Sequence, residues 1–365
     1  MRFLKYGIST GACAAAAAKA ALLALLDRPV EHVGVPTPIG LRLEIPIKGC
    51  RRIDSEKAMA WVVKDAGDDA DVTDGIEIFA AVRLLEGSHV VIRGGEGVGT
   101  VTKPGLPIPV GESAINPVPR MMIENAVREV LPPGKGVEVL IEVPRGAEIA
   151  GKTLNPKLGI VGGISILGTT GVVKPYSVKA YKRSLVPQID VALASGHPWI
   201  FLVPGNIGAE IARNVFKAPE DAIVQTGDFV GYMLRISVEK GAKNLILLGH
   251  AGKLVKLAAG IFNTHHKIAD ARMEVIAAYA ASAGAHPQLV ERMLQCNTTE
   301  ETIALLKEAN LLRSTFNKIA EKVRRRCIEK VENKAEISVI IVSLNGEILG
   351  VSGKAECMEK WLKST

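Results

Sequence analysis

Residues 244–253 read Asn-Leu-Ile-Leu-Leu-Gly-His-Ala-Gly-Lys, and this stretch indicates how the second half of the chain folds. The apolar run at 244–248 has the length of a buried strand, and Gly249 then allows a tight turn. The apolar segment that follows Lys253 predicts a long helix. A strand that passes through a glycine turn directly into a helix is typical of an α/β sheet with crossover helices.

The same alternation recurs through the second half of the chain. Apolar segments at 199–203, 222–225 and 336–343 predict further strands, and residues 228–240 predict a helix. Strands that alternate with helices pair in parallel. We therefore expect a Rossmann-like α/β domain with a mainly parallel sheet over residues 181–365.

The first half has a different rhythm. Segments 41–47, 89–93 and 137–143 alternate apolar and polar residues, which predicts half-buried strands. Residues 12–26 are rich in alanine, and Lys19 interrupts the run, so they predict a buried or amphipathic helix rather than a secretory signal. This order of elements favours an α+β domain over residues 1–180.

The boundary between the two domains is expected near Tyr181, just after a segment rich in glycine and threonine at 151–177. Exposed linkers are polar, whereas this segment is apolar. It is therefore predicted to form buried or ligand-facing loops.

Composition narrows the function. The chain of 365 residues has a net charge of +7 and only 4% aromatic residues. A basic protein attracts anions, but the scarce aromatics and scattered charges argue against a nucleic-acid partner. The five cysteines lack metal or redox spacing, which favours a reducing, cytoplasmic compartment. No segment has the roughly 20 apolar residues of a membrane span.

Two turns follow strands and open helices, at 205–208 and 249–253. In an open α/β sheet, ligands bind beyond the carboxyl ends of the strands, where helix N-termini attract anions. Such turns suit a carboxylate or phosphate, although a tight turn without a ligand remains the alternative. The candidate contacts are Gly205, Asn206, Gly208, Gly249, Gly252 and Lys253.

Other motifs are incomplete. A P-loop requires Ser or Thr after Lys253, but Leu254 stands there, which argues against a Mg²⁺-nucleotide kinase. The glycines at 95–99 precede a predicted strand, whereas a dinucleotide fingerprint requires a helix. His265 and His266 are adjacent, a poor spacing for metal chelation on a helix. The acidic segment 64–71 fails the EF-hand spacing and is either a turn or a ligand contact.

Several segments together resemble one family, the cobalt-precorrin-5B C(1)-methyltransferases, the CbiD proteins of anaerobic cobalamin biosynthesis. The resemblance runs in order from about Tyr6 to Arg272, and is weaker beyond Arg272. It is carried by six unusual motifs: YGISTGACAAA at 6–16, VKDAGDD at 63–69, VGTVTKPGL at 98–106, AINPVPR at 114–120, GISILGTTG at 163–171 and GHAGKLVKLAAG at 249–260, the last continuing to 264–265 and 269–272.

The resemblance implies transfer of a methyl group from S-adenosylmethionine to carbon 1 of cobalt-precorrin-5B, which gives cobalt-precorrin-6A. A precorrin carries many carboxylates, and a basic protein with amide-lined turns suits such a polyanion. Cobalt arrives inside the substrate, so no protein-bound metal is implied. An exposed apolar helix in the second half would point to a homodimer.

The site residues are expected as follows. The two turns of the second domain hold the methyl donor, and the tetrapyrrole lies across the interdomain cleft. If a base removes a ring N–H proton, His250 or Asp65 is the candidate. The expected tetrapyrrole contacts are Thr10, Lys64, Lys103, Arg120, Thr169, Thr170 and His265.

Overall fold

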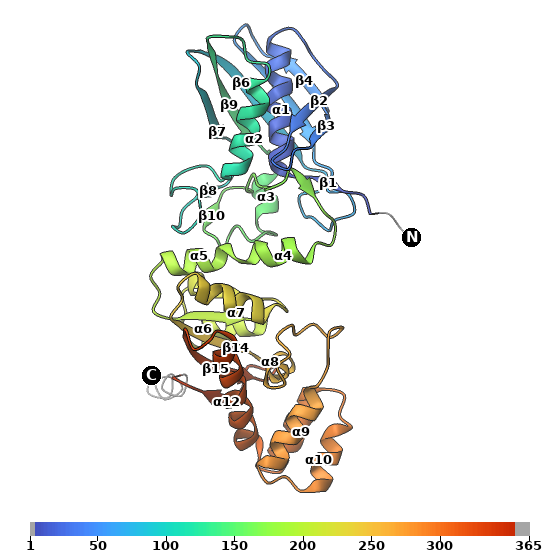
Figure 1. Ribbon diagram of the computed structural model, residues 1–365, viewed down its shortest axis with the longest axis vertical. Helices are drawn as coiled ribbons and strands as arrows, with labels where there is room; N and C mark the ends of the chain where they lie inside the picture. Colours follow the sequence, from blue (N-terminus) through green and yellow to red (C-terminus); the bar gives the residue numbers. More distant parts are fainter. Residues whose placement is uncertain (1–3, 355–365) are drawn as a thin grey trace. The chain divides into compact units, whose positions relative to one another are not determined.

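The computed structural model describes residues 4–354. Its contacts divide the chain into two compact units, of which unit 1 ends at Val178 and unit 2 begins at Lys179. Both combine helices with parallel and antiparallel strands, so the chain is a mixed α/β protein (Figure 1). Among residues 4–354, no helix is both long enough and apolar enough to cross a bilayer.

The centre of unit 1 is helix α1 (Thr10–Leu25), in which nearly every residue is buried. It packs against strands β5 (Lys57–Val63) and β6 (Glu77–Glu86) and against helix α2 (Pro117–Arg128) (Figure 1). Alanine is the best helix former, and its small side chain lets neighbouring elements approach closely. The prediction of a buried helix is confirmed.

Five strands of unit 1 form one sheet in the order β4-β5-β6-β9-β7, in which only the pair β7–β9 is parallel. The strands expected at 41–47, 89–93 and 137–143 are confirmed as β3, β7 and β9. The remaining elements of unit 1 are β1 (Gly7–Ile8), β2 (His32–Pro36), β3 (Arg42–Pro46), β4 (Gly49–Arg52), β7 (Val90–Gly94), β8 (Thr100–Val101), β9 (Lys135–Glu142), α3 (Gly146–Ala150), β10 (Ile160–Val161) and β11 (Val172–Val173).

Loops of unit 1 gather around short strand pairs. Strand β1 pairs with β11, and β8 pairs with β10. Gly97 has a φ of +68°, and a Cβ there would lie 1.8 Å from the Val143 carbonyl oxygen, so only glycine fits. Residues 163–166 are buried. The glycine-rich segment is therefore part of the packed fold and not a tether.

Unit 2 contains a second five-stranded sheet, in the order β13-β12-β14-β15-β16. Its first four strands are mutually parallel, and only β16 is antiparallel. The bounds of its strands are β12 (Ile200–Val203), β13 (Ile223–Gln225), β14 (Asn244–His250), β15 (Glu336–Val342) and β16 (Ile348–Ser352). The expected alternation of strands and helices, with a mainly parallel sheet, is confirmed.

One helix of unit 2 differs from its prediction. The prediction of a long helix after Gly249 is wrong, because α8 (Ala251–Ala258) ends after eight residues. Gly260, with a φ of +81°, turns the chain away two residues later, as glycines at helix ends commonly do. The other helices are α4 (Val178–Leu185), α5 (Pro187–Ala194), α6 (Asn206–Asn214), α7 (Val230–Glu239), α9 (Arg272–Ser282), α10 (Pro287–Leu294), α11 (Thr299–Glu308) and α12 (Leu312–Lys330).

The strand order of unit 2 creates a switch point. From β12 the chain continues to β13 on one side, and the next strand, β14, lies on the other side of β12. Connections that leave neighbouring strands in opposite directions open a crevice beyond their carboxyl ends, the usual ligand position in open α/β sheets. The two glycine turns found in the sequence stand at these strand ends.

Candidate functional site

The turns after β12 and β14 lie against each other. A Cβ on Gly249 would be 3.0 Å from the Cδ atom of Pro204, so the proline ring lies close to the Gly249 backbone. Gly208 is needed for packing, because its Cβ would lie 2.4 Å from the Leu248 carbonyl oxygen. Gly205, which caps α6, is exposed, and a Cβ there would meet no atom within 4 Å. Gly205 thus leaves backbone open to a ligand, whereas Gly208 has a structural role.

Asn206 begins helix α6 and is also exposed. Its Oδ1 atom accepts a hydrogen bond from the Gln225 side chain at 3.2 Å, which ties the first turn to the end of β13. The turn at 205–208 therefore contacts β13 through Asn206 and β14 through Gly208.

His250 is the N-cap of helix α8. Its Nδ1 atom accepts a hydrogen bond from the Gly252 backbone N–H at 3.2 Å. Burial lowers the pKa of His250 below its ordinary value, and the charges of Lys253 and Arg272 lower it further. The ring is thus held neutral, and because Nδ1 is an acceptor, Nε2 is assigned the proton. A neutral ring in this tautomer offers a hydrogen-bond donor rather than a base.

Lys253 points from the first turn of α8 to the carboxylate of Asp228, with which it forms an ion pair. Asp228 also accepts a hydrogen bond from the Thr264 hydroxyl at 3.0 Å. The bonds from Lys253 and Thr264 lower the pKa of Asp228 despite the opposing effect of its burial. The charge of Lys253 is therefore already matched within the protein.

These groups line a pocket of about 450 Å³ that lies wholly within unit 2. It brings together four of the predicted residues, His250, Gly252, Lys253 and His265. Gly205, Asn206 and Gly208 are not in its lining. The other lining residues were not predicted as site residues from the sequence; they are Asp228, Lys256, Thr264, His266, Arg272, Thr298, Thr299, Glu300 and Leu344.

Lys256 is the most deeply buried cation of this pocket, with 2% of its surface exposed. Its ammonium group donates to the carbonyl oxygens of Ala269 at 2.9 Å and Thr264 at 3.2 Å. Burial lowers its pKa. The spacing of Lys253 and Lys256 by three residues, which places both on one helix face, was a signal available in the sequence.

The two histidines of the pocket stack on each other, with ring centroids 4.5 Å apart. The Nδ1 atom of His265 accepts a hydrogen bond from the Lys267 backbone N–H at 3.2 Å. Among residues 4–354, no group of three or more His, Cys, Asp or Glu side chains is placed to hold a metal ion. The described cysteines 13, 50, 296 and 327 are free, and Cys357 lies outside the described residues.

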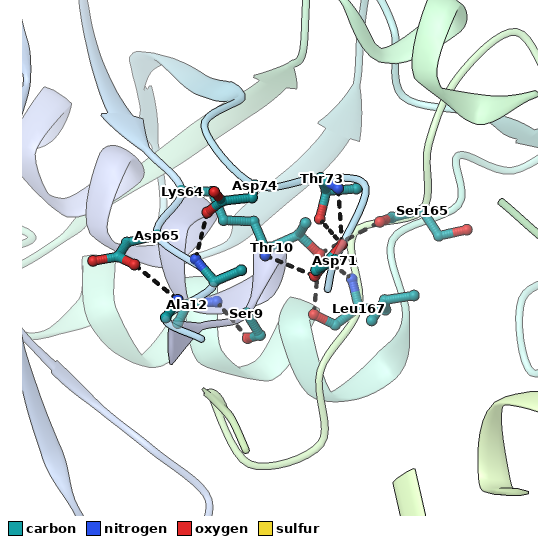
Figure 2. Close-up of polar contacts among 12 residues, drawn as sticks. Ser9, Thr10, Ala12, Lys64, Asp65, Asp71, Thr73, Asp74, Ser165 and Leu167 are labelled. Atoms are coloured by element: carbon teal, nitrogen blue, oxygen red, sulfur yellow. Dashed lines mark hydrogen bonds and ion pairs between the residues drawn. The ribbon is translucent and has the colours of Figure 1, made fainter. Parts of the chain in front are cut away.

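Two of the predicted residues of unit 1, Thr10 and Lys64, belong to a polar cluster near the start of α1 (Figure 2). The Thr10 hydroxyl accepts a hydrogen bond from the Leu167 N–H at 2.8 Å and donates to the Leu167 carbonyl at 3.1 Å. Lys64 is 2% exposed and donates to the Asp71 carboxylate at 2.8 Å (Figure 2). Both side chains therefore have internal partners that join distant segments of unit 1.

Asp65, the other candidate base, is exposed and is turned away from this cluster (Figure 2). Its carboxylate pairs with Lys5 and accepts a hydrogen bond from the Gly67 N–H at 2.8 Å. The bonds from Lys5 and Gly67 lower its pKa, which weakens it as a base.

The remaining predicted contacts of unit 1 differ in exposure. Arg120 donates to the carbonyl oxygens of Ile92 at 3.0 Å and Ile115 at 3.1 Å, so it fastens α2 to two other segments. Lys103 is half-buried, with its chain against Gly159. Thr170 and Val172 share a local turn, in which the Thr170 hydroxyl donates to the Val172 carbonyl at 3.0 Å. Thr169 is exposed.

Two family models match the chain. The model described as CbiD matches residues 1–175, and the model of the CbiD C-terminal domain matches residues 263–353. The second match covers α9 to β16 and part of the loop before them, the region where the resemblance read from the sequence is weak.

Curated relatives match over nearly the whole chain. A protein of Methanocaldococcus jannaschii is 48% identical over 95% of this chain and 96% of its own length. A protein of Alkaliphilus metalliredigens is 45% identical over 99% of this chain and 96% of its own length. Both are named cobalt-precorrin-5B C(1)-methyltransferase.

A solved structure of a cobalamin biosynthesis protein (cbiD) from Archaeoglobus fulgidus is also similar. It is 33% identical in sequence, with a TM-score of 0.40, and the match covers 75% of this chain and 86% of that one.

Proposed function

The chain belongs to the CbiD family, which makes it a cobalt-precorrin-5B C(1)-methyltransferase of cobalamin biosynthesis, and we propose that S-adenosylmethionine is its methyl donor and binds in unit 2. The observation that carries the function is the match to curated methyltransferases over nearly the whole chain. The product of the reaction is cobalt-precorrin-6A.

The chemistry is a displacement at a methyl group on a positively charged sulfur. The electron-rich macrocycle supplies the carbon nucleophile, so the protein contributes mainly the approach geometry and the exclusion of water. The substrate is a polycarboxylate, and the net charge of +7 favours its approach.

The donor site we propose is the crevice at the switch point between β12 and β14. Unit 2 is then a Rossmann-like domain, in which the donor contacts Gly205 and Asn206 of the first turn and Gly249, Gly252 and Lys253 of the second. Gly208 packs the first turn against β14. Two features support this position. Exposed backbone at Gly205 and the N-terminus of α8 both face the region where open α/β sheets bind ligands.

Within unit 1, we propose that Lys103, Thr169 and Thr170 contact the tetrapyrrole and that Thr10, Lys64 and Arg120 support the surrounding loops. The internal hydrogen bonds of Thr10, Lys64 and Arg120 indicate that these three act by holding the loops in shape. Thr169 is exposed and offers its hydroxyl directly.

His250 acts in this proposal as a hydrogen-bond donor to the reacting ligands. Its Nδ1 atom is occupied by the helix cap, so Nε2 would have to lose its own proton before the ring could accept one from substrate. Asp65 has a lowered pKa and is held by Lys5, which makes it a weak base. Neither group is tuned toward the operating pH of an efficient base.

Calorimetry with S-adenosylhomocysteine tests the donor site. Wild-type protein is expected to bind it, and Lys253→Ala is expected to weaken binding about tenfold with the fold intact. Lys240→Ala is the matched control, because Lys240 is a half-exposed lysine of the same unit, paired with Asp190 at 2.7 Å. It precedes the start of β14, whereas the turn at 249–253 lies at the end of that strand. Unchanged affinity in Lys253→Ala would assign the turn a structural role only.

A further inference from the structure

The lining of the pocket in unit 2 holds three cations, Lys253, Lys256 and Arg272, and two carboxylates, Asp228 and Glu300. Asp228 is paired with Lys253, and Asp270 holds Arg272 through two bonds, at 2.8 and 2.6 Å. Lys256 has only carbonyl partners, and within the described residues no carboxylate lies at ion-pair distance from it. A buried ammonium group without a counter-ion is costly, which points to an anion supplied from outside.

The one remaining carboxylate of the lining does not change this balance. Glu300 accepts a hydrogen bond from the Leu344 N–H at 3.0 Å, and it stands in the first turn of α11, where a negative charge is favourable. The Glu300 carboxylate therefore interacts with the N-terminus of α11 and with the backbone that follows β15. Within residues 4–354, Lys256 therefore has no carboxylate within ion-pair distance, and the charges of Asp270 and Asp228 act on it only from farther away.

Two helix N-termini meet in the same pocket. Gly252 lies in the first turn of α8, and Thr299 is the first residue of α11. The two are neighbours, since a Cβ on Gly252 would be 3.6 Å from the Thr299 hydroxyl oxygen. The first turn of α8 has no acidic residue, so the positive end of its dipole adds to the charge of Lys256, whereas Glu300 and Glu301 already offset the dipole of α11.

We infer that this pocket binds a carboxylate group of a ligand, with Lys256 as its counter-ion and with Arg272 and Thr299 at its rim. The inference rests on the proposed function and deepens it. The ligands of that reaction offer two sources of an alkyl carboxylate. One is the methionine end of the methyl donor, and the other is an acetate or propionate arm of the tetrapyrrole.

The position of Lys256 explains why such a site is held in shape. Its two carbonyl bonds pull Thr264 and Ala269 toward α8, and Asp228 fixes the Thr264 hydroxyl from the other side. These bonds fix the loop at 261–271 beside the pocket, and they also fix the orientation of the Lys256 ammonium group. A preorganised cation costs little rearrangement when the carboxylate arrives.

The test replaces Lys256 by methionine, which keeps the length of the side chain and removes its charge. Lys19→Met is the matched control, because Lys19 is also a buried lysine, 8% exposed, but belongs to unit 1 and pairs with Glu129. Thermal unfolding checks that each variant folds. Arg272→Gln is a second variant of the same pocket, which keeps the Lys256 bonds and is expected to act in the same direction with a smaller effect.

Three measurements show which ligand supplies the carboxylate: the affinity for S-adenosylhomocysteine, the affinity for 5′-methylthioadenosine and the KM for cobalt-precorrin-5B. In Lys256→Met, we expect either a 10- to 100-fold weaker affinity for S-adenosylhomocysteine, with 5′-methylthioadenosine unchanged, or a 10- to 100-fold higher KM for cobalt-precorrin-5B. The first result assigns the carboxylate to the methyl donor, because methylthioadenosine lacks the amino-acid end. The second assigns it to the tetrapyrrole.

Two results would overturn the inference. One is wild-type behaviour of both Lys256→Met and Arg272→Gln in all three readouts. The other is an equal loss for S-adenosylhomocysteine and methylthioadenosine, which would show that Lys256 only shapes the loop. A wild-type protein that neither binds S-adenosylhomocysteine nor transfers methyl would instead overturn the proposed function, so the two failures are distinguishable.

Discussion

Replacing His250 separates two roles that the structure gives to one side chain. Its Nδ1 atom caps helix α8, and its Nε2–H group is available in the pocket. His250→Ala removes both functions. His250→Asn keeps a cap, because asparagine is among the best N-cap residues, but removes the imidazole donor.

The expected magnitudes follow from the cap. Loss of an N-cap lowers the free energy of unfolding by about 0.5–2 kcal/mol. The cap bond of His250 is 3.2 Å long, so we expect His250→Ala to lower this free energy by about 1 kcal/mol. For a domain of this size, that lowers Tm by about 2–4 °C. His250→Asn is expected to remain within about 1 °C of wild type. Both variants lose one hydrogen bond to the reacting ligands, which lowers kcat/KM by about tenfold.

The pH dependence gives a second measure. Folding lowers the pKa of His250 below the value of about 6.5 that it has in the unfolded chain, so the unfolded state binds more protons. The contribution to stability is complete above about pH 6.5 and is lost as the pH falls through the folded pKa. His250→Asn removes this part of the pH dependence.

Scanning calorimetry of the full chain at pH 8 and pH 5.5 measures the stability, and transfer of labelled methyl measures the activity. The transition of unit 2 is the one that S-adenosylhomocysteine raises. Equal Tm values for the alanine variant and wild type would refute the cap. Full activity in His250→Asn would refute the donor role.

Three further changes test other parts of the structure. Gly208→Ala places a methyl group 2.4 Å from a backbone oxygen and is expected to lower the free energy of unfolding in urea by about 1–3 kcal/mol. Gly205→Ala has open space around the new methyl group and is expected to weaken only the binding of S-adenosylhomocysteine. Equal stability losses in the two variants would contradict this assignment. Glu129→Gln is expected to cost about 0.5–1.5 kcal/mol, because its carboxylate accepts bonds from Arg42 and Lys19 but is exposed, so that solvent screens the pairs. The bonds from Arg42 and Lys19 lower its pKa to about 2, so the contribution is present above about pH 4.5 and is lost as the pH falls toward 2. An unchanged acid-unfolding midpoint in the variant would count against this role. Thr10→Val is expected to lower the Tm of unit 1 and to raise the KM for cobalt-precorrin-5B, and no change in Tm would show that the hydroxyl does not hold the 165–167 segment.

The sequence was sufficient where short-range pattern decides the structure. The run at 244–248 and the alanine-rich run after Ser9 are each recognisable from period and composition, and they form β14 and α1 as expected. The two glycine turns were recognisable for the same reason, because strand, glycine and helix follow one another directly. Their meeting at one switch point required the strand order, which no local pattern contains.

The pocket was less predictable because its residues are brought together by folding. Lys256 owes its place to carbonyl groups of Thr264 and Ala269, which have no side-chain signature in the sequence. The role of His250 as a cap depends on the hydrogen bond between its Nδ1 atom and the Gly252 N–H. Sequence reasoning selected it as a base, since the sequence does not show which ring nitrogen is occupied.

Charged residues of unit 1 illustrate the same limit. Lys64 and Arg120 were selected as ligand contacts because cations suit a polyanion. In the structure, Lys64 is buried against Asp71, and Arg120 donates to the carbonyl oxygens of the nearby Ile115 and of Ile92 on β7. A cation in a distinctive motif can serve the fold as readily as a ligand, and only its partners distinguish the two uses.

The most direct test of the central claim is incubation of the purified full chain with cobalt-precorrin-5B and S-adenosylmethionine labelled in its methyl group. We expect one label per tetrapyrrole, attached to carbon 1, together with an equal amount of S-adenosylhomocysteine. Absence of label from the tetrapyrrole, or its attachment at another ring position, would contradict the account.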